Sequence, residues 1–186
     1  RPLTDRMKEL TFRRVDANQF PFFRAGQYVS LQGKVGGNVV SRPYSIVSSP
    51  REALDNKLVL GVEDAGFFSG YLNREAKVGE RFTMAVPTGE FHYETLRDRK
   101  QIVCIAGGSG ITPFLSMAKS MEEGDECYEM TLFYGARDEA HIAYKAELDA
   151  LAEKGLKVVY VLSDEEQEGY EHGFVTSQLL ERYVDI

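Results

Sequence analysis

The first half of the chain alternates between short apolar segments and turn residues. Turn signals such as Gly36-Gly37 and Ser49-Pro50 separate segments that are rich in β-branched and aromatic residues. The pattern predicts strands at 10–15, 27–32, 42–47, 58–62 and 81–85, and one short helix near 70–74. Several short strands with so little helix favour a small antiparallel barrel.

After residue 99 the pattern changes to alternating strands and helices. The continuous apolar segment 102–106 predicts a strand that is covered on both faces. The helix that follows has apolar residues every three to four positions, at Ile111, Phe114, Leu115, Ala118 and Met121. Further strands are expected at 130–134 and 157–162, and further helices at 143–154 and 176–183. This alternation predicts a parallel, doubly wound sheet.

We therefore expect two domains, an antiparallel barrel at 1–98 and an α/β domain at 99–186. The first carries 14 Lys/Arg and 12 Asp/Glu, a balance of +2, and the second carries 8 and 17, a balance of −9. This asymmetry supports the division, and the net charge of −7 argues against a nucleic-acid partner.

The sequence contains no apolar run of the roughly 18 to 20 residues that a membrane span needs, and no signal-peptide pattern. Cys104 and Cys127 form neither a CxxC motif nor a metal-ligand spacing, which fits a reducing compartment. We expect a cytoplasmic protein without a metal site. The chain has no initiator Met and its last predicted element ends as if another strand should follow, so we expect a truncated α/β domain.

A glycine-rich turn, Gly107-Gly108-Ser109-Gly110-Ile111-Thr112-Pro113, joins the first apolar strand of the second half to its helix. Free amides and the macrodipole at a helix N-terminus attract anions, and glycines allow a pyrophosphate to approach the backbone. The turn therefore predicts a dinucleotide site, although it departs from G-x-G-x-x-G at its last position. A nucleophile elbow, G-x-S-x-G, is disfavoured because residue 111 is isoleucine.

The segment Arg42-Pro43-Tyr44-Ser45 combines a cation, an aromatic ring and a hydroxyl on one predicted strand. A guanidinium can bind a phosphate through two hydrogen bonds, and a tyrosine ring can stack on a flat heterocycle. Taken alone, the segment also fits an ordinary strand with a surface arginine. A second small anion site is predicted at Gly66-Phe67-Phe68-Ser69, where the short helix begins.

The order of these motifs along the chain resembles the ferredoxin–NADP reductase superfamily, in particular its bacterial oxygenase-reductase and ferredoxin-reductase-like branches. The resemblance implies a small flavin-binding barrel followed by a partial dinucleotide domain, and an enzyme that binds FAD and NAD(P)H. It implies that Arg42 binds the flavin pyrophosphate, while Tyr44 and Ser45, the catalytic candidates, contact the isoalloxazine ring. Pro43 belongs to the same motif. FMN in place of FAD stays open.

The resemblance assigns further residues to the two cofactors. Residues Gly66 to Ser69 are expected to hold the flavin phosphates through backbone amides and the Ser69 hydroxyl, so that Phe67 and Phe68 contribute their backbone. Residues Gly107 to Pro113 are expected to receive the nicotinamide dinucleotide, with Thr112 close to the stacked rings. Tyr134, Gly135 and Arg137 match the family's second strand end beside the pyridine nucleotide.

NADH is expected over NADPH because Ser163 is followed by Asp164-Glu165-Glu166, which would repel a 2′-phosphate. The expected acceptor of the electrons is a ferredoxin or a fused [2Fe-2S] domain. Two other functions remain open at this point. One is an electron-transfer subunit that binds flavin without oxidising NAD(P)H, and the other is an interaction module with neither cofactor.

Overall fold

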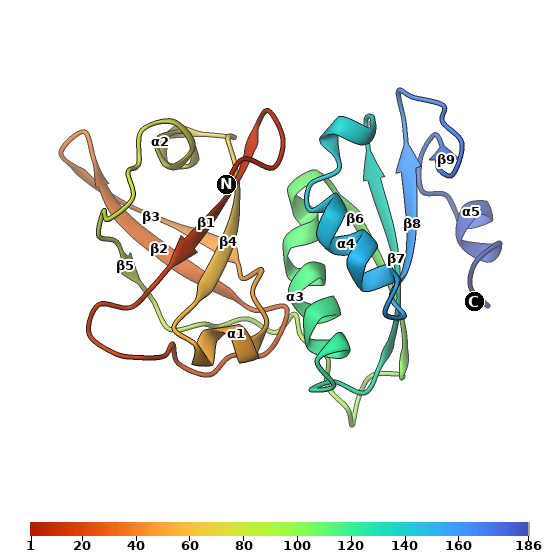
Figure 1. Cartoon of the computed structure of the whole chain (residues 1–186), viewed down its shortest axis with the longest axis horizontal. Helices are drawn as coiled ribbons and strands as arrows, with labels where there is room; N and C mark the ends of the chain where they lie inside the picture. Colours follow the sequence, from red (N-terminus) through yellow and green to blue (C-terminus); the bar gives the residue numbers. More distant parts are fainter. Residues whose placement is uncertain (186) are drawn as a thin grey trace.

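The computed structural model describes residues 1–185, and these form two packed halves joined near residue 99 (Figure 1). The first half holds two small antiparallel sheets, of order β1-β4 and β3-β2-β5. Its elements are β1 (Met7–Phe12), β2 (Tyr28–Val35), β3 (Asn38–Ser45), α1 (Pro50–Leu54), β4 (Leu58–Glu63), α2 (Phe67–Arg74) and β5 (Thr83–Met84). An isolated bridge from Ile46 to Leu60 connects the two sheets into a barrel-like unit, and one from Tyr28 to Thr88 extends the pairing of β2 with the segment after β5.

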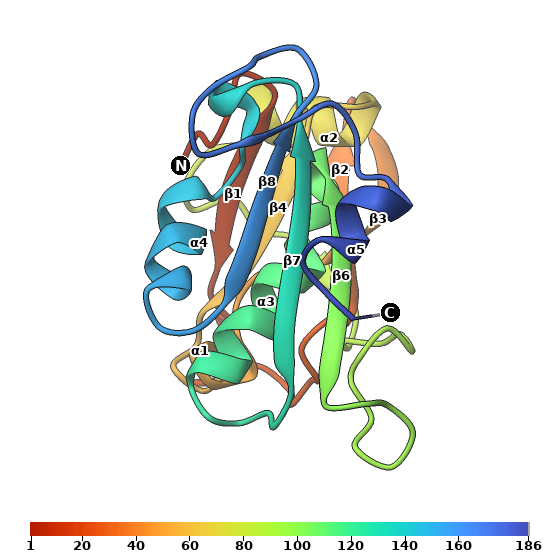
Figure 2. The same ribbon diagram turned by 90° about the vertical axis from the view of Figure 1, so that its right-hand side faces the viewer.

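The second half is a parallel four-stranded sheet of order β6-β7-β8-β9. Its elements are β6 (Gln101–Gly107), α3 (Ile111–Glu122), β7 (Glu129–Ala136), α4 (Lys145–Ala152), β8 (Lys157–Leu162), β9 (Glu171–His172) and α5 (Ser177–Glu181). Helices α3 and α4 cover the face toward the barrel, and α5 lies on the opposite face (Figures 1 and 2). The expected fold class, an antiparallel barrel followed by a parallel α/β unit, is confirmed.

One part of the prediction for β6 is wrong. Its apolar run was expected to be covered on both faces, but burial alternates along the strand. Cys104 and Ala106 are buried under α3, whereas Val103 and Ile105 are 47% and 51% exposed. Helix α5 packs against Phe133 and the β8 residues next to it, while the outer face of β6 stays about half exposed at Val103 and Ile105.

The sequence prediction also missed α1, whose start was interpreted as a turn at Ser49-Pro50. Ser49 is the N-cap of this helix, and its hydroxyl accepts the Glu52 amide at 3.2 Å. The Glu52 carboxylate accepts the Ser49 amide at 3.0 Å, which completes a capping box. The signal was present in the letters S-P-R-E, because proline at the first helical position and glutamate two positions later are typical of a helix start.

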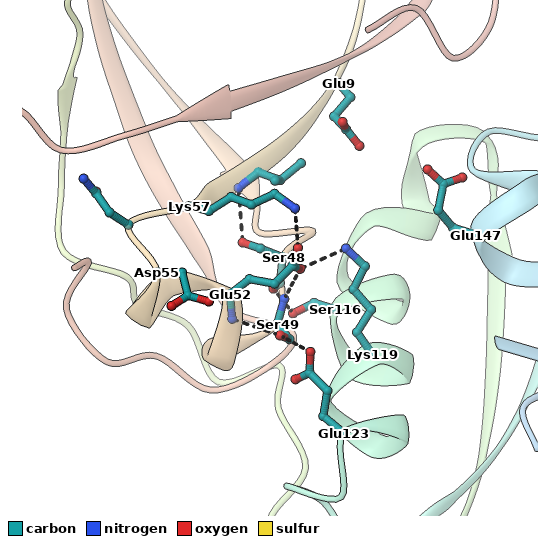
Figure 3. A network of polar contacts seen from close by, with 12 residues as sticks. Glu9, Ser48, Ser49, Glu52, Asp55, Lys57, Ser116, Lys119, Glu123 and Glu147 are labelled. Atoms are coloured by element: carbon teal, nitrogen blue, oxygen red, sulfur yellow. Dashed lines mark hydrogen bonds and ion pairs between the residues drawn. The ribbon is translucent and has the colours of Figure 1, made fainter. Parts of the chain in front are cut away.

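Helix α1 fixes the barrel against α3 through a group of polar contacts that we call the clasp: Ser48, Ser49, Glu52, Lys57, Ser116, Lys119 and Glu123 (Figure 3). The buried Ser116 hydroxyl donates to the Ser48 carbonyl at 2.8 Å. Glu52 accepts Lys119 of α3 at 3.0 Å and Lys57 of the barrel at 2.5 Å. Burial by itself would raise the pKa of Glu52, but the two lysines hold it below its usual value.

Apolar packing also crosses the boundary between the halves. Met7, Val47 and Val59 of the barrel belong to the same buried cluster as Ile111 and Leu115 of α3. A second cluster fills the barrel interior, and a third lies under α5. The two halves are therefore held in one relative position by a shared core as well as by the clasp. Among residues 1–185 no helix is both long and apolar enough to cross a lipid bilayer.

Candidate flavin and dinucleotide site

We call the interface between the two halves the seam. A cleft of about 570 Å³ opens between the halves at the end of the seam away from the clasp. Both halves contribute to its walls. Its lining residues are Arg42, Pro43, Tyr44, Ser45, Gly61, Glu63, Ala65, Gly66, Phe67, Phe68, Ser69, Ser109, Gly110, Thr112 and Pro113. Twelve of these fifteen belong to the three motifs singled out in the sequence, so the fold brings segments that are far apart in the chain to one place.

The Arg-Pro-Tyr-Ser segment forms the end of β3, which is an edge strand of its sheet. Pro43 has no amide hydrogen and is tolerated there because an edge strand needs no second partner. The exposed Arg42 guanidinium donates to the Ser41 carbonyl at 2.7 Å and forms no ion pair with another residue of 1–185. It is therefore available to an anionic ligand at the mouth of the cleft.

Tyr44 lies half-buried beside the start of α2. Its ring centroid is 6.5 Å from that of Phe68, at an interplanar angle of 48°. Burial raises the pKa of the Tyr44 hydroxyl, and the nearby Arg42 opposes this rise. The hydroxyl therefore stays protonated at neutral pH. Tyr44 is positioned by the barrel core behind it, where Phe68 is 2% exposed.

The start of α2 forms the second wall of the flavin side. Gly66 is the N-cap and supplies no side chain, so the first amides of the helix have no side-chain acceptor. The Ser69 hydroxyl accepts the Ala65 amide at 3.1 Å and donates to the Gly66 carbonyl at 3.2 Å. Phe67 is 63% exposed at the rim. Free amides at a helix start suit a phosphate, as the sequence motif suggested.

The glycine-rich turn forms the opposite wall. Residues 108–110 make one turn of 3-10 helix between β6 and α3. Gly108 has a φ of +51°, which L-amino acids with side chains rarely adopt. A Cβ atom at Gly108 or Gly110 would meet nothing within 4 Å, so the space beside this backbone is open. Gly110 lines the cleft, whereas Gly108 lies outside the lining. Thr112 donates to the Ser109 carbonyl at 3.0 Å and faces the same space.

Some of the predicted site residues lie behind the turn and do not line the cleft. Ile111 is fully buried in the shared core. Tyr134 is also fully buried; its hydroxyl donates to the Gly108 carbonyl at 2.9 Å and accepts the Ala143 amide at 3.2 Å. Burial raises its pKa. Tyr134 can therefore position the turn, but its side chain cannot touch a ligand in this arrangement. Gly107 lies at the end of β6 and is outside the lining.

Gly135, Arg137, Ser163 and Asp164 lie outside the cleft lining, at the carboxyl ends of β7 and β8. The Asp164 amide donates to the Arg137 carbonyl at 2.8 Å, which joins the two strand ends. The Ser163 hydroxyl donates to Asp164 at 2.6 Å, and the guanidinium of Arg137 contacts His141 at 2.5 Å. Because the carboxyl ends of parallel strands share one edge of a sheet, these residues follow the glycine-rich turn along that edge.

Three residues of the cleft, Gly61, Glu63 and Ala65, were missed by the sequence analysis. Glu63, the last residue of β4, accepts the Ser109 hydroxyl at 2.6 Å across the seam. Gly61 lies two residues earlier on the same face of β4, and a Cβ there would be 2.6 Å from Thr112 Cγ2. No sequence signal marks Glu63 or Gly61, because their importance arises from a contact between elements that are 46 or more residues apart.

Comparisons with known proteins agree with this geometry. Residues 4–93 match the oxidoreductase FAD-binding domain family, and residues 104–186 match the oxidoreductase NAD-binding domain family. NADH-cytochrome b5 reductase 1 of Dictyostelium discoideum is 37% identical over 161 residues, covering 84% of this chain and 55% of the relative. The carnitine monooxygenase reductase subunit of Escherichia coli is 32% identical over 148 residues, covering 79% and 45%.

Solved structures show the same fold. The flavohem-like FAD/NAD-binding domain of nitric oxide dioxygenase from Vibrio cholerae has a TM-score of 0.84 at 20% identity, covering 95% of this chain and 76% of that one. The chain spans about half the length of the two curated relatives, the cytochrome b5 reductase and the carnitine monooxygenase reductase subunit. The two domain matches together extend over nearly the whole chain, and so it belongs to the ferredoxin–NADP reductase-like oxidoreductases, which are built from an FAD-binding and an NAD-binding domain.

Proposed function

We propose that this chain is a reductase unit that binds FAD and NADH in one cleft and delivers electrons to another protein or domain. The observation that carries the proposal is the composition of the cleft, whose two walls come from the two halves. Within residues 1–185, the flavin side offers a guanidinium that forms no ion pair, a half-buried tyrosine and a helix start without a side-chain cap. The other side offers a glycine-rich backbone with open space beside it.

The residues of the flavin wall are proposed to have separate roles. Arg42 binds the pyrophosphate, since a charge-assisted hydrogen bond to phosphate is among the stronger polar contacts. Tyr44 provides a flat surface for the isoalloxazine ring, and the Ser45 hydroxyl supplies a hydrogen bond near its reactive edge. The amides at Gly66 to Ser69 complete the phosphate site. Open space at Gly66, where a Cβ would meet only the Ser69 hydroxyl at 4.0 Å, fits such a ligand.

The glycine-rich turn and Thr112 are proposed to hold the nicotinamide nucleotide against the flavin. When both cofactors are bound they supply the redox chemistry, in which a hydride passes from NADH to the flavin and leaves NAD⁺. The chain contributes binding, orientation and exclusion of water. The shared core and the clasp keep the two walls at a fixed separation, which matters because a transfer between stacked rings requires close approach.

We propose NADH as the preferred nucleotide. Asp164 is exposed after β8, and Ser163 donates to it, so a carboxylate stands at the strand end where a ribose hydroxyl could donate. Arg137, the nearby cation that could favour a 2′-phosphate, is in contact with His141. Asp164→Arg should therefore shift the ratio of kcat/KM values toward NADPH by about tenfold or more. An unchanged ratio would reject this role for the acidic loop.

The proposed acceptor is a ferredoxin or a fused [2Fe-2S] domain. The similarity to a monooxygenase reductase subunit and to a 2-halobenzoate 1,2-dioxygenase electron transfer component supports an acceptor within an oxygenase system. Cytochrome b5 is a second candidate, favoured by the 37% identity to an NADH-cytochrome b5 reductase. Mixing the reduced protein with each acceptor in a stopped-flow experiment would separate the two, because only the correct class reoxidises the flavin rapidly.

The first test is to saturate the chain with FAD without oxygen and to titrate it with NADH while recording the flavin absorbance. Bleaching at stoichiometric NADH is expected and would establish hydride transfer. A bound flavin that stays oxidised would instead favour an electron-transfer subunit that receives electrons from another protein. Failure to bind either cofactor would reject the proposed function in favour of an interaction module.

A further inference from the structure

Glu63 is a negative charge in a cleft that otherwise suits anions. It is the one carboxylate among the lining residues that the structure describes. Within residues 1–185 it forms no ion pair, and Arg74 pairs with the neighbouring Asp64 instead. Its one polar side-chain partner there is the Ser109 hydroxyl, at 2.6 Å. An unpaired carboxylate opposes the binding of phosphates, so its position in the cleft calls for an explanation.

Glu63 lies where the flavin-side half meets the glycine-rich turn. Strand β4 belongs to the flavin-side half and contacts β3, which carries the Arg-Pro-Tyr-Ser segment. Ser109 belongs to the glycine-rich turn on the other side. The bond between them therefore crosses the cleft where the two proposed cofactor surfaces meet. Gly61, on the same face of β4, brings Thr112 to within contact distance of the strand and so closes the floor beside Glu63.

We propose that Glu63 selects for the oxidised form of the nicotinamide nucleotide, and this inference rests on the proposed function. Of the groups that the cleft is proposed to bind, the oxidised nicotinamide ring is the one with a positive charge. When the C–H bond of NADH breaks, its electron pair leaves with the hydride for the flavin, and the ring becomes cationic. The Glu63 carboxylate stabilises that charge, and the Ser109 hydroxyl holds the carboxylate in place.

The expected size of the effect follows from Coulomb's law. At an effective dielectric constant of about 20, opposite unit charges as far as about 12 Å apart still change a binding equilibrium about tenfold, so an effect of this size does not require direct contact between Glu63 and the ring. Glu63→Gln removes the charge and keeps an oxygen that can accept the Ser109 hydroxyl. The pyrophosphate is common to the oxidised and reduced nucleotides, so its repulsion by Glu63 cancels when the two are compared. The substitution should therefore raise the ratio of the NAD⁺ dissociation constant to that of a neutral, reduced nucleotide about tenfold.

The test uses the FAD-loaded, oxidised protein and two nucleotides that cannot reduce it. These are NAD⁺ and 1,4,5,6-tetrahydro-NAD, a neutral analogue of NADH that donates no hydride. Dissociation constants are measured from flavin difference spectra for the original protein, Glu63→Gln and Glu75→Gln. Glu75 is an exposed carboxylate at the end of α2, outside the cleft lining, so its substitution matches the change in net charge.

A rise in the ratio of the NAD⁺ constant to the analogue's constant, confined to Glu63→Gln, supports the proposal. An unchanged ratio overturns it, as does an equal change for both nucleotides. If the Ser109–Glu63 hydrogen bond only holds the two walls of the cleft together, Ser109→Ala should weaken the binding of both nucleotides equally, and Glu63→Gln should change the binding of neither. If the original protein binds neither nucleotide, the proposed function itself fails, and this result is distinguishable from a ratio that does not respond to Glu63.

Discussion

The two ends of the seam between the halves differ in how their charges are arranged. At the clasp, Glu52 lies between Lys57 and Lys119, and Arg51 pairs with Asp125. At the cleft, Arg42 and Glu63 form no ion pair within residues 1–185. The same helix, α3, contributes to both ends. The difference indicates that the polar groups of the clasp hold the two halves in position, whereas those of the cleft are available to bind ligands.

The comparison also explains why both ends are needed. Arg42 and Glu63 form no ion pair across the cleft within residues 1–185, and the hydrogen bond from Ser109 to Glu63 contributes little by itself to the force that holds the two walls together. The clasp and the shared apolar core supply that force at a distance from the cleft. Substitutions at the cleft should therefore change ligand binding with little effect on stability, and those at the clasp should do the reverse.

Gly61 is the exception to this rule, and its substitution is expected to have the largest effect. In Gly61→Val the new side chain would overlap Thr112 and Met7, whose atoms lie 2.6 and 2.7 Å from the Cβ position. We expect a loss of about 3 kcal/mol in the free energy of unfolding, typical of an overpacked contact. Reduction of the flavin by NADH should also be lost, because the walls would move apart.

Denaturant unfolding and anaerobic NADH titration measure these two effects for Gly61→Val. Gly110→Ala is the control for stability, because Gly110 has an ordinary φ of −62° and a Cβ there meets nothing within 4 Å. Its unfolding free energy should match that of the original protein. Equal stability of Gly61→Val and Gly110→Ala would contradict the close contact between β4 and α3.

Arg42→Ala is expected to have an intermediate effect, confined to ligand binding. Removal of a charge-assisted contact to a pyrophosphate should weaken FAD binding by about 1.5–3 kcal/mol. The unfolding free energy of the flavin-free protein should change little, because within residues 1–185 the exposed guanidinium makes one hydrogen bond, to the Ser41 carbonyl. Flavin fluorescence titration measures the affinity. An unchanged FAD affinity would remove Arg42 from the proposed site.

Glu123→Gln is expected to have the smallest effect, and it should be stabilising. Burial raises the pKa of the Glu123 carboxyl, one oxygen of which is buried without a hydrogen bond, while the Ser49 hydroxyl donates to the other. A folded-state pKa above the unfolded value means that the folded protein binds more protons between the two. The contribution of Glu123 to stability therefore falls as the pH rises through its folded pKa.

Glutamine has no such proton equilibrium, so the advantage of Glu123→Gln should grow from pH 4 to pH 7 and stay below about 1 kcal/mol, because solvent screens the group. Thermal unfolding across this range measures it. Glu52 provides the opposite case, since its lowered pKa makes its contribution increase with pH. A Glu123→Gln variant that is less stable than the original at pH 7 would contradict the unfavourable burial.

Much of the fold could be predicted from local signals in the sequence. The periodicity of α3, the β-forming segments and the turn residues gave the order of strands and helices and the fold class. The predicted first and last residues of the strands and helices were less accurate. The first strand was predicted at 10–15 and is found at Met7–Phe12, because its pairing with β4 determines where it ends. The domain boundary at residue 98 and the cytoplasmic location stay predictions.

The candidate site was predictable where its residues form continuous motifs. Residue type and spacing were enough to mark two such segments, Arg42 to Ser45 and Ser109 to Pro113, as candidates. Glu63 and Gly61 could not be found this way, because an ordinary strand sequence surrounds them and their partners lie in the other half. Tyr134 shows the reverse difficulty. Its motif predicted a residue beside the nucleotide, while its tertiary position puts the hydroxyl under the turn.

The shared core has a consequence for recombining this protein with its relatives. A chimera that exchanges one half at the peptide link near residue 99 would preserve the chain connection but mismatch Met7, Val47 and Val59 with a foreign α3. The contact that a chimera must preserve is the interface between α1 and α3. Exchange should succeed when both helices and the buried residues beneath them come from the same parent, whatever the position of the crossover in the sequence.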